Sequence, residues 1–376
     1  MTCPHASLHA LNVLNAAQTA DAAAMQAFYE HLHGQTRLSH EPDLGLRLAG
    51  APELARAALQ HRDLGPRPPG QAVPATLEGG TIGSVFAQWL RMRDDADHAR
   101  EKTALQAALD QLEQDVDLLE SCSRQQARLA LSLGWRHWQW ASLPASLAQL
   151  LGLQMQDAAA QQLLLQRLHA IALALRPQAE PSTVQAASDA CLALVEALGK
   201  HGPAPLWSAL KAQAAVIAAP QAQALGLLWQ SYEAGAGMLG QALLASSQVG
   251  EQDETFDGSD LMAELARAPG AIHHTRRWAQ RDCEFAGASM RAGDAVLVLL
   301  TGAQPRLAFG HGRHQCPGEN LALRIGSWAL LEARTARATA APLFAPPTLL
   351  GFEALPNARI PVFAPATAST ATQQKP

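Results

Sequence analysis

The sequence predicts a mostly α-helical protein with small β-sheets near its C-terminal end. Its length suits one large helical domain or two average ones. Hydrophobic residues make up 48% of the 376 residues, which is enough to fill a large core. Much of this apolar content is Ala and Leu, which favour helix. Helical patterns cover most of the chain up to about residue 248, whereas the clearest hairpin signals lie beyond residue 283.

The helical patterns are separated by turn-forming residues. They occupy residues 19–32, 85–133, 143–175, 182–198, 206–248 and 321–336. The 206–248 stretch has few charges, so we expect it to be buried on most sides. An extended piece is expected at 44–48. Residues 283–300 and 352–363 alternate around turn signals, which predicts two short hairpins.

Composition and charge argue against several classes of protein. The formal net charge is −5 at pH 7, which offers no basic surface for nucleic acid and does not indicate disorder. No run reaches the ~20 apolar residues of a membrane-spanning helix, and the first residues do not resemble a secretory signal. The cysteine count of 5 is odd, which argues for a reducing compartment. We therefore expect a cytoplasmic protein that binds neither nucleic acid nor a membrane.

The segment 307–318, directly before a predicted helix, carries the strongest chemical signal in the chain. Its glycines are Gly310, Gly312 and Gly318. They permit a tight loop whose amides point at one atom, as a metal-bound thiolate requires. The nearby helix start is expected to lower the pKa of the Cys316 thiol, and Phe309 can pack beside the sulfur. An incidental cysteine in a glycine-rich turn is the alternative, which the complete spacing Phe-Gly-x-Gly-x-His-x-Cys-x-Gly disfavours.

This spacing resembles the cysteine loop of the cytochrome P450 family, in particular its soluble bacterial members. The resemblance implies a haem-thiolate enzyme with a cytochrome P450-like fold in a single large domain over residues 1–365. The tail at 366–376 is rich in Thr, Ala and Gln and is expected to be disordered. It implies haem b as the cofactor, with Cys316 as the thiolate ligand of the iron. In the family a Glu-x-x-Arg pair braces the core beneath the haem, and Glu264 and Arg267 match that pair.

Further residues match the family's ligands of the haem propionates. His314 lies in the cysteine loop, and Arg277 lies on a segment resembling the strand that carries a propionate-binding arginine. Arg276 is a near alternative, and a pair of surface arginines is the simpler interpretation. His98 and Lys102 match a histidine and a basic residue four positions later. Lys102 replaces the usual arginine, so it can neutralise a carboxylate but cannot form a bidentate fork.

The resemblance places Gln230, Ser231, Glu233 and Ala234 on the distal face of the haem. The family usually has a small pair there, followed by an acid and a threonine that support oxygen binding and proton delivery. Glu233 takes the acid position, and Ala234 takes the threonine position. Protons would then come from Glu233, Ser231, water ordered by Gln230, or the substrate. An alignment shifted by one helical turn is the alternative.

A second departure from the family precedes the cysteine loop. A long irregular segment is reduced here to residues 301–306, which alters the surface where an electron donor would dock. Arg306 is a candidate replacement partner for Glu264. His273 and His274 either border the distal side or form a surface turn.

The resemblance implies oxidation of a small organic substrate by dioxygen, as a monooxygenase supplied with electrons by a separate ferredoxin or flavodoxin. The missing threonine leaves two other classes open. One is a peroxide-driven peroxygenase or a non-oxygenating haem enzyme such as an isomerase or dehydratase. The other is a degenerate protein that binds haem without catalysis.

Overall fold

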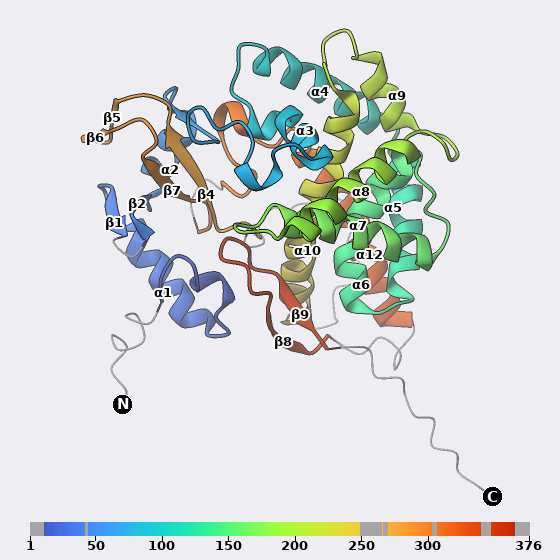
Figure 1. The fold of residues 1–376 in the computed structure, drawn as a ribbon. Helices are drawn as coiled ribbons and strands as arrows, with labels where there is room; N and C mark the ends of the chain where they lie inside the picture. Colours follow the sequence, from blue (N-terminus) through green and yellow to red (C-terminus); the bar gives the residue numbers. More distant parts are fainter. Residues whose placement is uncertain are drawn as a thin grey trace, which may run out of the picture.

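Most of the described chain is helical, and the larger helices gather on one side of the molecule (Figure 1). The computed structural model describes residues 11–41, 44–248, 265, 270–302, 307–339 and 347–364. The helices are α1 (Ala22–His33), α2 (Pro52–Gln60), α3 (Thr81–Gln88), α4 (His98–Glu113), α5 (Val116–Leu131), α6 (Trp135–Leu150), α7 (Ala158–Ala174), α8 (Pro181–Ala197), α9 (Pro205–Ala212), α10 (Pro220–Gln248) and α12 (Glu319–Thr339). The predicted fold class, mostly α with small sheets, is confirmed.

Helix α10 passes through the helical part and contacts α6, α7, α9 and α12. Glycines permit this close packing. A Cβ atom added at Gly240 would lie 2.3 Å from Nε2 of Gln139 on α6, and one at Gly237 would lie 2.4 Å from Cβ of Ala271. The expectation of an uninterrupted 206–248 helix is wrong, because α9 ends at Ala212 and α10 begins at Pro220. Proline suits a helix start, where its missing N–H has no intrahelical acceptor.

The 85–133 stretch is mostly helical, as predicted, whereas the 143–175 stretch begins inside a longer helix. The 85–133 pattern is divided among the end of α3, a short 3₁₀ turn at Leu90–Met92, α4 and α5. Asp115 separates the last two, and its side chain accepts a hydrogen bond from the N–H of Leu118, which caps α5. The 143–175 pattern covers the end of α6 and all of α7, since α6 begins earlier, at Trp135.

The main sheet joins strands from both ends of the sequence. Its strand order is β1-β2-β7-β4-β3, with β2 parallel to β7 and the remaining pairs antiparallel. The strands are β1 (Ser39–Glu41), β2 (Leu46–Ala49), β3 (Leu64–Gly65), β4 (His274–Ala279) and β7 (Ala295–Leu299). Helix α2 packs against β2 and β7. Figure 1 shows this sheet, with α1 and α2, opposite the larger helices.

The remaining strands form two hairpins. They are β5 (Cys283–Phe285) with β6 (Ala288–Met290), and β8 (Leu349–Phe352) with β9 (Pro361–Phe363). The predicted 283–300 hairpin is therefore too long, because β7 leaves it and pairs with β2 and β4. The predicted second hairpin is confirmed, although it begins a few residues before 352.

Several sequence predictions lie outside the described residues. These are the Glu264–Arg267 pair, Arg306 and the tail at 366–376. Within the described ranges, no helix is long and apolar enough to cross a membrane.

Candidate functional site

The cysteine loop is closed by a backbone hydrogen bond between Phe309 and Cys316. The N–H of Cys316 donates to the carbonyl oxygen of Phe309 at 2.8 Å. Gly310 and Gly312 adopt φ values of +76° and +68°, which residues with side chains rarely adopt. The predicted tight loop is confirmed, and it delivers Cys316 to the residues just before α12.

The environment of Cys316 combines solvent access with close protein contact. Its side chain is exposed, yet surrounding protein raises the pKa of the thiol by desolvation. A backbone hydrogen bond from Gly318 and the charges of Arg91 and Lys102 lower that pKa, but burial outweighs them. The expectation of a lowered thiol pKa is therefore wrong for this free thiol, because desolvation exceeds the stabilisation at the helix start.

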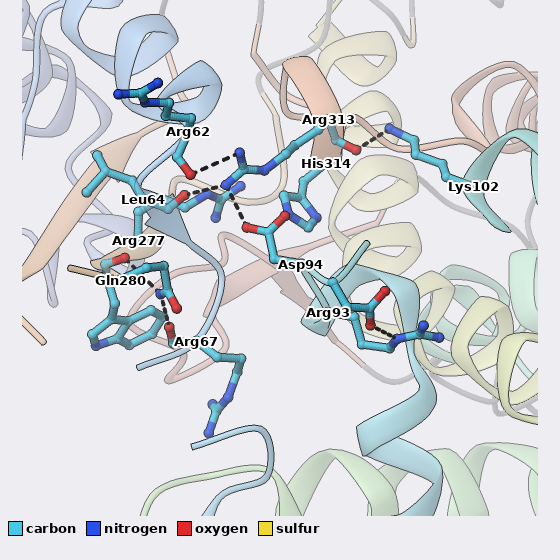
Figure 2. Close-up of polar contacts among 12 residues, drawn as sticks. Arg62, Leu64, Arg67, Arg93, Asp94, Lys102, Arg277, Gln280, Arg313 and His314 are labelled. Carbon is cyan, nitrogen blue, oxygen red and sulfur yellow. Dashed lines mark hydrogen bonds and ion pairs between the residues drawn. The ribbon is translucent and has the colours of Figure 1, made fainter. Parts of the chain in front are cut away.

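Arg313 ties the cysteine loop to two other parts of the chain (Figure 2). Its Nη2 atom donates to Oδ2 of Asp94 at 2.6 Å and to the carbonyl of Leu64 at 3.1 Å. Its own carbonyl accepts a hydrogen bond from Nζ of Lys102 at 2.7 Å. Lys102, predicted to bind a propionate, thus contacts the loop backbone. Neither Arg313 nor Asp94 was recognised in the sequence, although Asp94 opens the acidic run before His98.

His314 and His98 lie together at the edge of this cluster. Their rings are 4.7 Å apart, and Nε2 of His314 lies 3.3 Å from Oδ1 of Asp94. The His314 side chain is only 3% exposed, and burial lowers its pKa to about 4 despite the nearby carboxylate. Burial also lowers the pKa of His98. Both rings are therefore neutral at pH 7 and can donate or accept hydrogen bonds.

Arg277 points into the molecule from β4. The strand alternates, so Arg276 is exposed while Arg277 is only 7% exposed. Burial lowers the pKa of Arg277 to about 10, and the positive charges of Arg91 and Arg313 add to this effect. Among the described residues, its Nε atom has no hydrogen-bond partner. The surface-arginine interpretation is wrong for Arg277, and its burial favours it over Arg276.

The predicted distal residues lie in the middle of α10. Nε2 of Gln230 donates to the carbonyl of Gly226 at 2.9 Å, and Oγ of Ser231 donates to that of Leu228 at 2.8 Å. Both polar groups are therefore engaged by the helix itself. Ala234 is partly buried.

Glu233 is held in a partly buried position on the same helix. Burial raises the pKa of its carboxyl group, while the charges of Arg176 and Arg91 oppose the increase. Nη2 of Arg176 lies 3.9 Å from Oε1 of Glu233. Arg176 is itself 46% exposed, so this ion pair connects Glu233 with the protein surface.

Both His273 and His274 are buried, with exposed fractions of 1% and 5%. Nδ1 of His273 is 2.6 Å from the hydroxyl of Tyr29, and Nε2 of His274 contacts the carbonyls of Val13 and Pro356. The surface-turn interpretation of these histidines is therefore wrong. Their contacts are with α1, the segment before it and the loop after β8.

The residues around Cys316 fit a haem. Within the described ranges, no group of three or more His, Cys, Asp or Glu side chains is placed to hold a metal ion. A haem would bring its own nitrogen ligands to an iron bound by Cys316. Arg277 Nε and His314 Nδ1 are buried with no hydrogen-bond partner in the part of the chain that the structure describes, and propionates would satisfy them.

Comparison with known proteins gives short sequence matches and extensive structural ones. No family model matches the sequence. Cytochrome P450 CYP105Q4 of Mycobacterium marinum is 30% identical over 125 residues, covering 26% of this chain and 30% of the relative. Cytochrome P450 105C1 of a Streptomyces species is 36% identical over 92 residues, covering 18% of this chain and 24% of the relative. The matches thus span less than a third of either relative.

Solved cytochromes P450 resemble the chain over most of its length. Epothilone B-bound P450epoK superposes with a TM-score of 0.69 at 17% identity, covering 89% of this chain and 94% of that one. Ligand-free cytochrome P450 TbtJ1 gives a TM-score of 0.63 at 17% identity, covering 93% of this chain and 99% of that one. The chain has the cytochrome P450 fold. The two partial sequence matches agree with the resemblance that the cysteine loop carries.

Proposed function

We propose that the protein is a haem-thiolate oxidoreductase that oxidises a small organic substrate, as a dioxygen-dependent monooxygenase with an external electron donor. The observation that carries this proposal is the closed loop around Cys316, together with the unpartnered nitrogen atoms of the buried side chains of Arg277 and His314 among the described residues. Haem b is the proposed cofactor. A cytoplasmic location and a ferredoxin or flavodoxin as donor are part of the same proposal.

Residues of three segments, α4, β4 and the cysteine loop, form the proposed haem site. In this proposal Cys316 is the iron ligand, and Arg277, His314 and His98 bind the propionates. Phe309 and the glycines shape the loop beneath the sulfur. Lys102 acts through its 2.7 Å hydrogen bond to the carbonyl of Arg313, which holds the loop against α4. When bound, the haem supplies the redox chemistry that these side chains lack.

Proton delivery on the distal side is proposed to depend on Glu233. Burial favours the protonated carboxyl, and Arg176 reaches it from the surface at 3.9 Å. Glu233 can therefore hold a proton at neutral pH more readily than an exposed carboxyl. The methyl group of Ala234 cannot relay that proton. Ser231 and Gln230 can do so only by leaving the helix carbonyls that they now bind.

The lack of a free hydroxyl group beside Glu233 to relay its proton favours a second candidate function, in which the oxidant is peroxide. Hydrogen peroxide carries its own protons and two oxidising equivalents, so a peroxygenase needs neither a distal hydroxyl nor an electron donor. Isomerase-like or dehydratase-like haem chemistry and a degenerate haem-binding protein are further alternatives. Turnover with peroxide alone, compared with turnover driven by a reductase system, separates these cases. Activity with neither oxidant, despite full haem loading, would favour the degenerate protein.

The haem-thiolate assignment can be tested by spectroscopy. The reduced protein with carbon monoxide should show the strongly red-shifted Soret band of thiolate ligation, and Cys316→Ser should abolish it. Cys283→Ser is the matched control, because Cys283 lies on the β5–β6 hairpin, and it should retain the band. Persistence of the band in Cys316→Ser, or its absence from the wild-type protein, would contradict the assignment.

A further inference from the structure

Arg91 is a cation to which the proposed function assigns no role. It lies in the short turn Leu90–Met92, which is anchored to the start of α10. Nε1 of Trp89 donates to the carbonyl of Ala222 at 2.9 Å, and Nε2 of Gln223 donates to that of Gln88 at 2.6 Å. The position of the Arg91 backbone is therefore fixed relative to α10.

The guanidinium of Arg91 lies along the face of α10 that carries Glu233. Its central carbon is 6.0 Å from the ring centre of Trp229, which stacks on Trp89 with ring centres 4.7 Å apart. Trp229 and Glu233 are four residues apart in the helix, so their side chains share one face. Arg91 is exposed to solvent, although the surrounding protein lowers its pKa by desolvation. The charges of Cys316 and Glu233 raise that pKa, so both groups lie near the guanidinium.

Arg91 lacks the acidic partners that its neighbour Arg93 has. Arg93 binds Asp95 at 2.6 Å and Glu101 at 2.9 Å. In the described part of the chain, Arg91 has neither an ion pair within 4.0 Å nor a hydrogen bond from its side chain. Its positive charge also adds to the lowering of the Arg277 pKa, so the two guanidinium groups are near enough to repel each other. A bound anion would remove that repulsion.

We propose that Arg91 binds a carboxylate group of a ligand held between the cysteine loop and α10. The inference rests on the proposed haem-thiolate function and adds to it. The carboxylate can come from a haem propionate or from an acidic substrate, and a guanidinium suits both because it donates two parallel hydrogen bonds. Arg277 would bind a second acid group of the same ligand or of its neighbour.

The test uses the haem-loaded full chain and three variants: Arg91→Gln, Arg91→Lys and Arg100→Gln. Arg100 is the matched control, because it is exposed on α4 and pairs only with Asp97 at the surface. The first measurement is the rate of haem transfer to apomyoglobin. The second is the affinity for phenylimidazole and for its para-carboxylate analogue, read from the Soret shift as the imidazole coordinates iron.

If the partner is a propionate, Arg91→Gln should lose haem about tenfold faster than Arg100→Gln, and Arg91→Lys should lie between them. If the partner is a substrate carboxylate, haem loss should be unchanged. The affinity for the carboxylate probe should then fall about tenfold while that for phenylimidazole stays the same. Behaviour like that of Arg100→Gln in both measurements would overturn the inference. A wild-type protein that holds no haem would instead overturn the proposed function.

Discussion

Replacing Asp94 with Asn removes the acid shared by two residues of the cysteine loop. Asp94 accepts a 2.6 Å hydrogen bond from Arg313 and lies 3.3 Å from His314. A hydrogen bond to a charged group contributes about 1.5–3 kcal/mol to stability. The side chains of Asp94 and Arg313 are 24% and 30% exposed, so solvent screening reduces the expected loss to about 1–2 kcal/mol. For a chain of this length, that loss corresponds to a fall in Tm of about 2 °C.

The pH dependence of this loss follows from the pKa of Asp94. Burial raises that pKa, but the nearby His314 ring and the charge of Arg313 outweigh burial, so the net effect is a lowered value. A carboxyl whose pKa is lowered by folding stabilises the protein above its unfolded pKa of about 4. The stabilisation is lost as the pH falls through the folded value. The difference between wild type and Asp94→Asn should therefore be constant from neutral pH to about pH 4 and shrink below it.

Thermal unfolding of both proteins at a fixed scan rate, followed by circular dichroism between pH 3 and pH 7, measures this difference. Asp97→Asn is the control, because Asp97 pairs with Arg100 only at the surface, and its Tm should stay near that of wild type. An Asp94→Asn protein as stable as Asp97→Asn at pH 7 would refute the reasoning. A difference that grows as the pH falls would also refute it.

Three further perturbations test other parts of the structure. Glu101→Gln should lower stability by about 3 kcal/mol in thermal unfolding, since Glu101 is 2% exposed and pairs with Arg93 at 2.9 Å; a loss below about 0.5 kcal/mol would contradict this. Burial raises the pKa of Glu233, so dioxygen-driven turnover of the wild-type protein should decline as the pH rises above the ordinary carboxyl range. Glu233→Gln should remove this decline. An unchanged pH profile would exclude a role of Glu233 in proton delivery. Gly310→Ala should cost about 1–2 kcal/mol and weaken haem retention, because φ is +76° at Gly310. Gly318→Ala should cost less, since its new Cβ would meet Leu109 Cδ1 at an ordinary 3.8 Å; equal effects of the two substitutions would contradict the argument.

Features that depend on adjacent residues could be predicted from the sequence. The loop from Phe309 to Cys316 closes on itself, and its glycines adopt the backbone conformations that the sequence requires. The burial of Arg277 rather than Arg276 follows from the alternation of a strand, once the strand is recognised. Both features are determined within a few residues of chain.

Features that depend on distant segments could not be predicted in this way. Asp94 and Arg313 are 219 positions apart, and nothing in the sequence around either residue indicates their contact. The partners of β7 are β2 and β4, so a local hairpin pattern was assigned to the wrong pairing. The direction of the Cys316 pKa shift was wrong for a related reason. The helix start is local, whereas the burial that outweighs it comes from segments brought together by folding.

The charges around the cysteine loop link ligand binding to folding. Arg277 and Arg313 lie near each other, and their repulsion opposes folding unless an anion compensates it. Asp94 accepts a hydrogen bond from Arg313. Among the described residues, Arg277 contacts only a nearby hydroxyl and a backbone carbonyl, and one of its buried nitrogen atoms has no partner. A diacid ligand bound here would compensate these positive charges. Part of its binding free energy would therefore come from removing the repulsion that is present in the ligand-free fold. A ligand that binds the folded state and not the unfolded state stabilises the protein more as its concentration rises. Stability and cofactor loading should therefore change together when Arg277 or Arg313 is replaced.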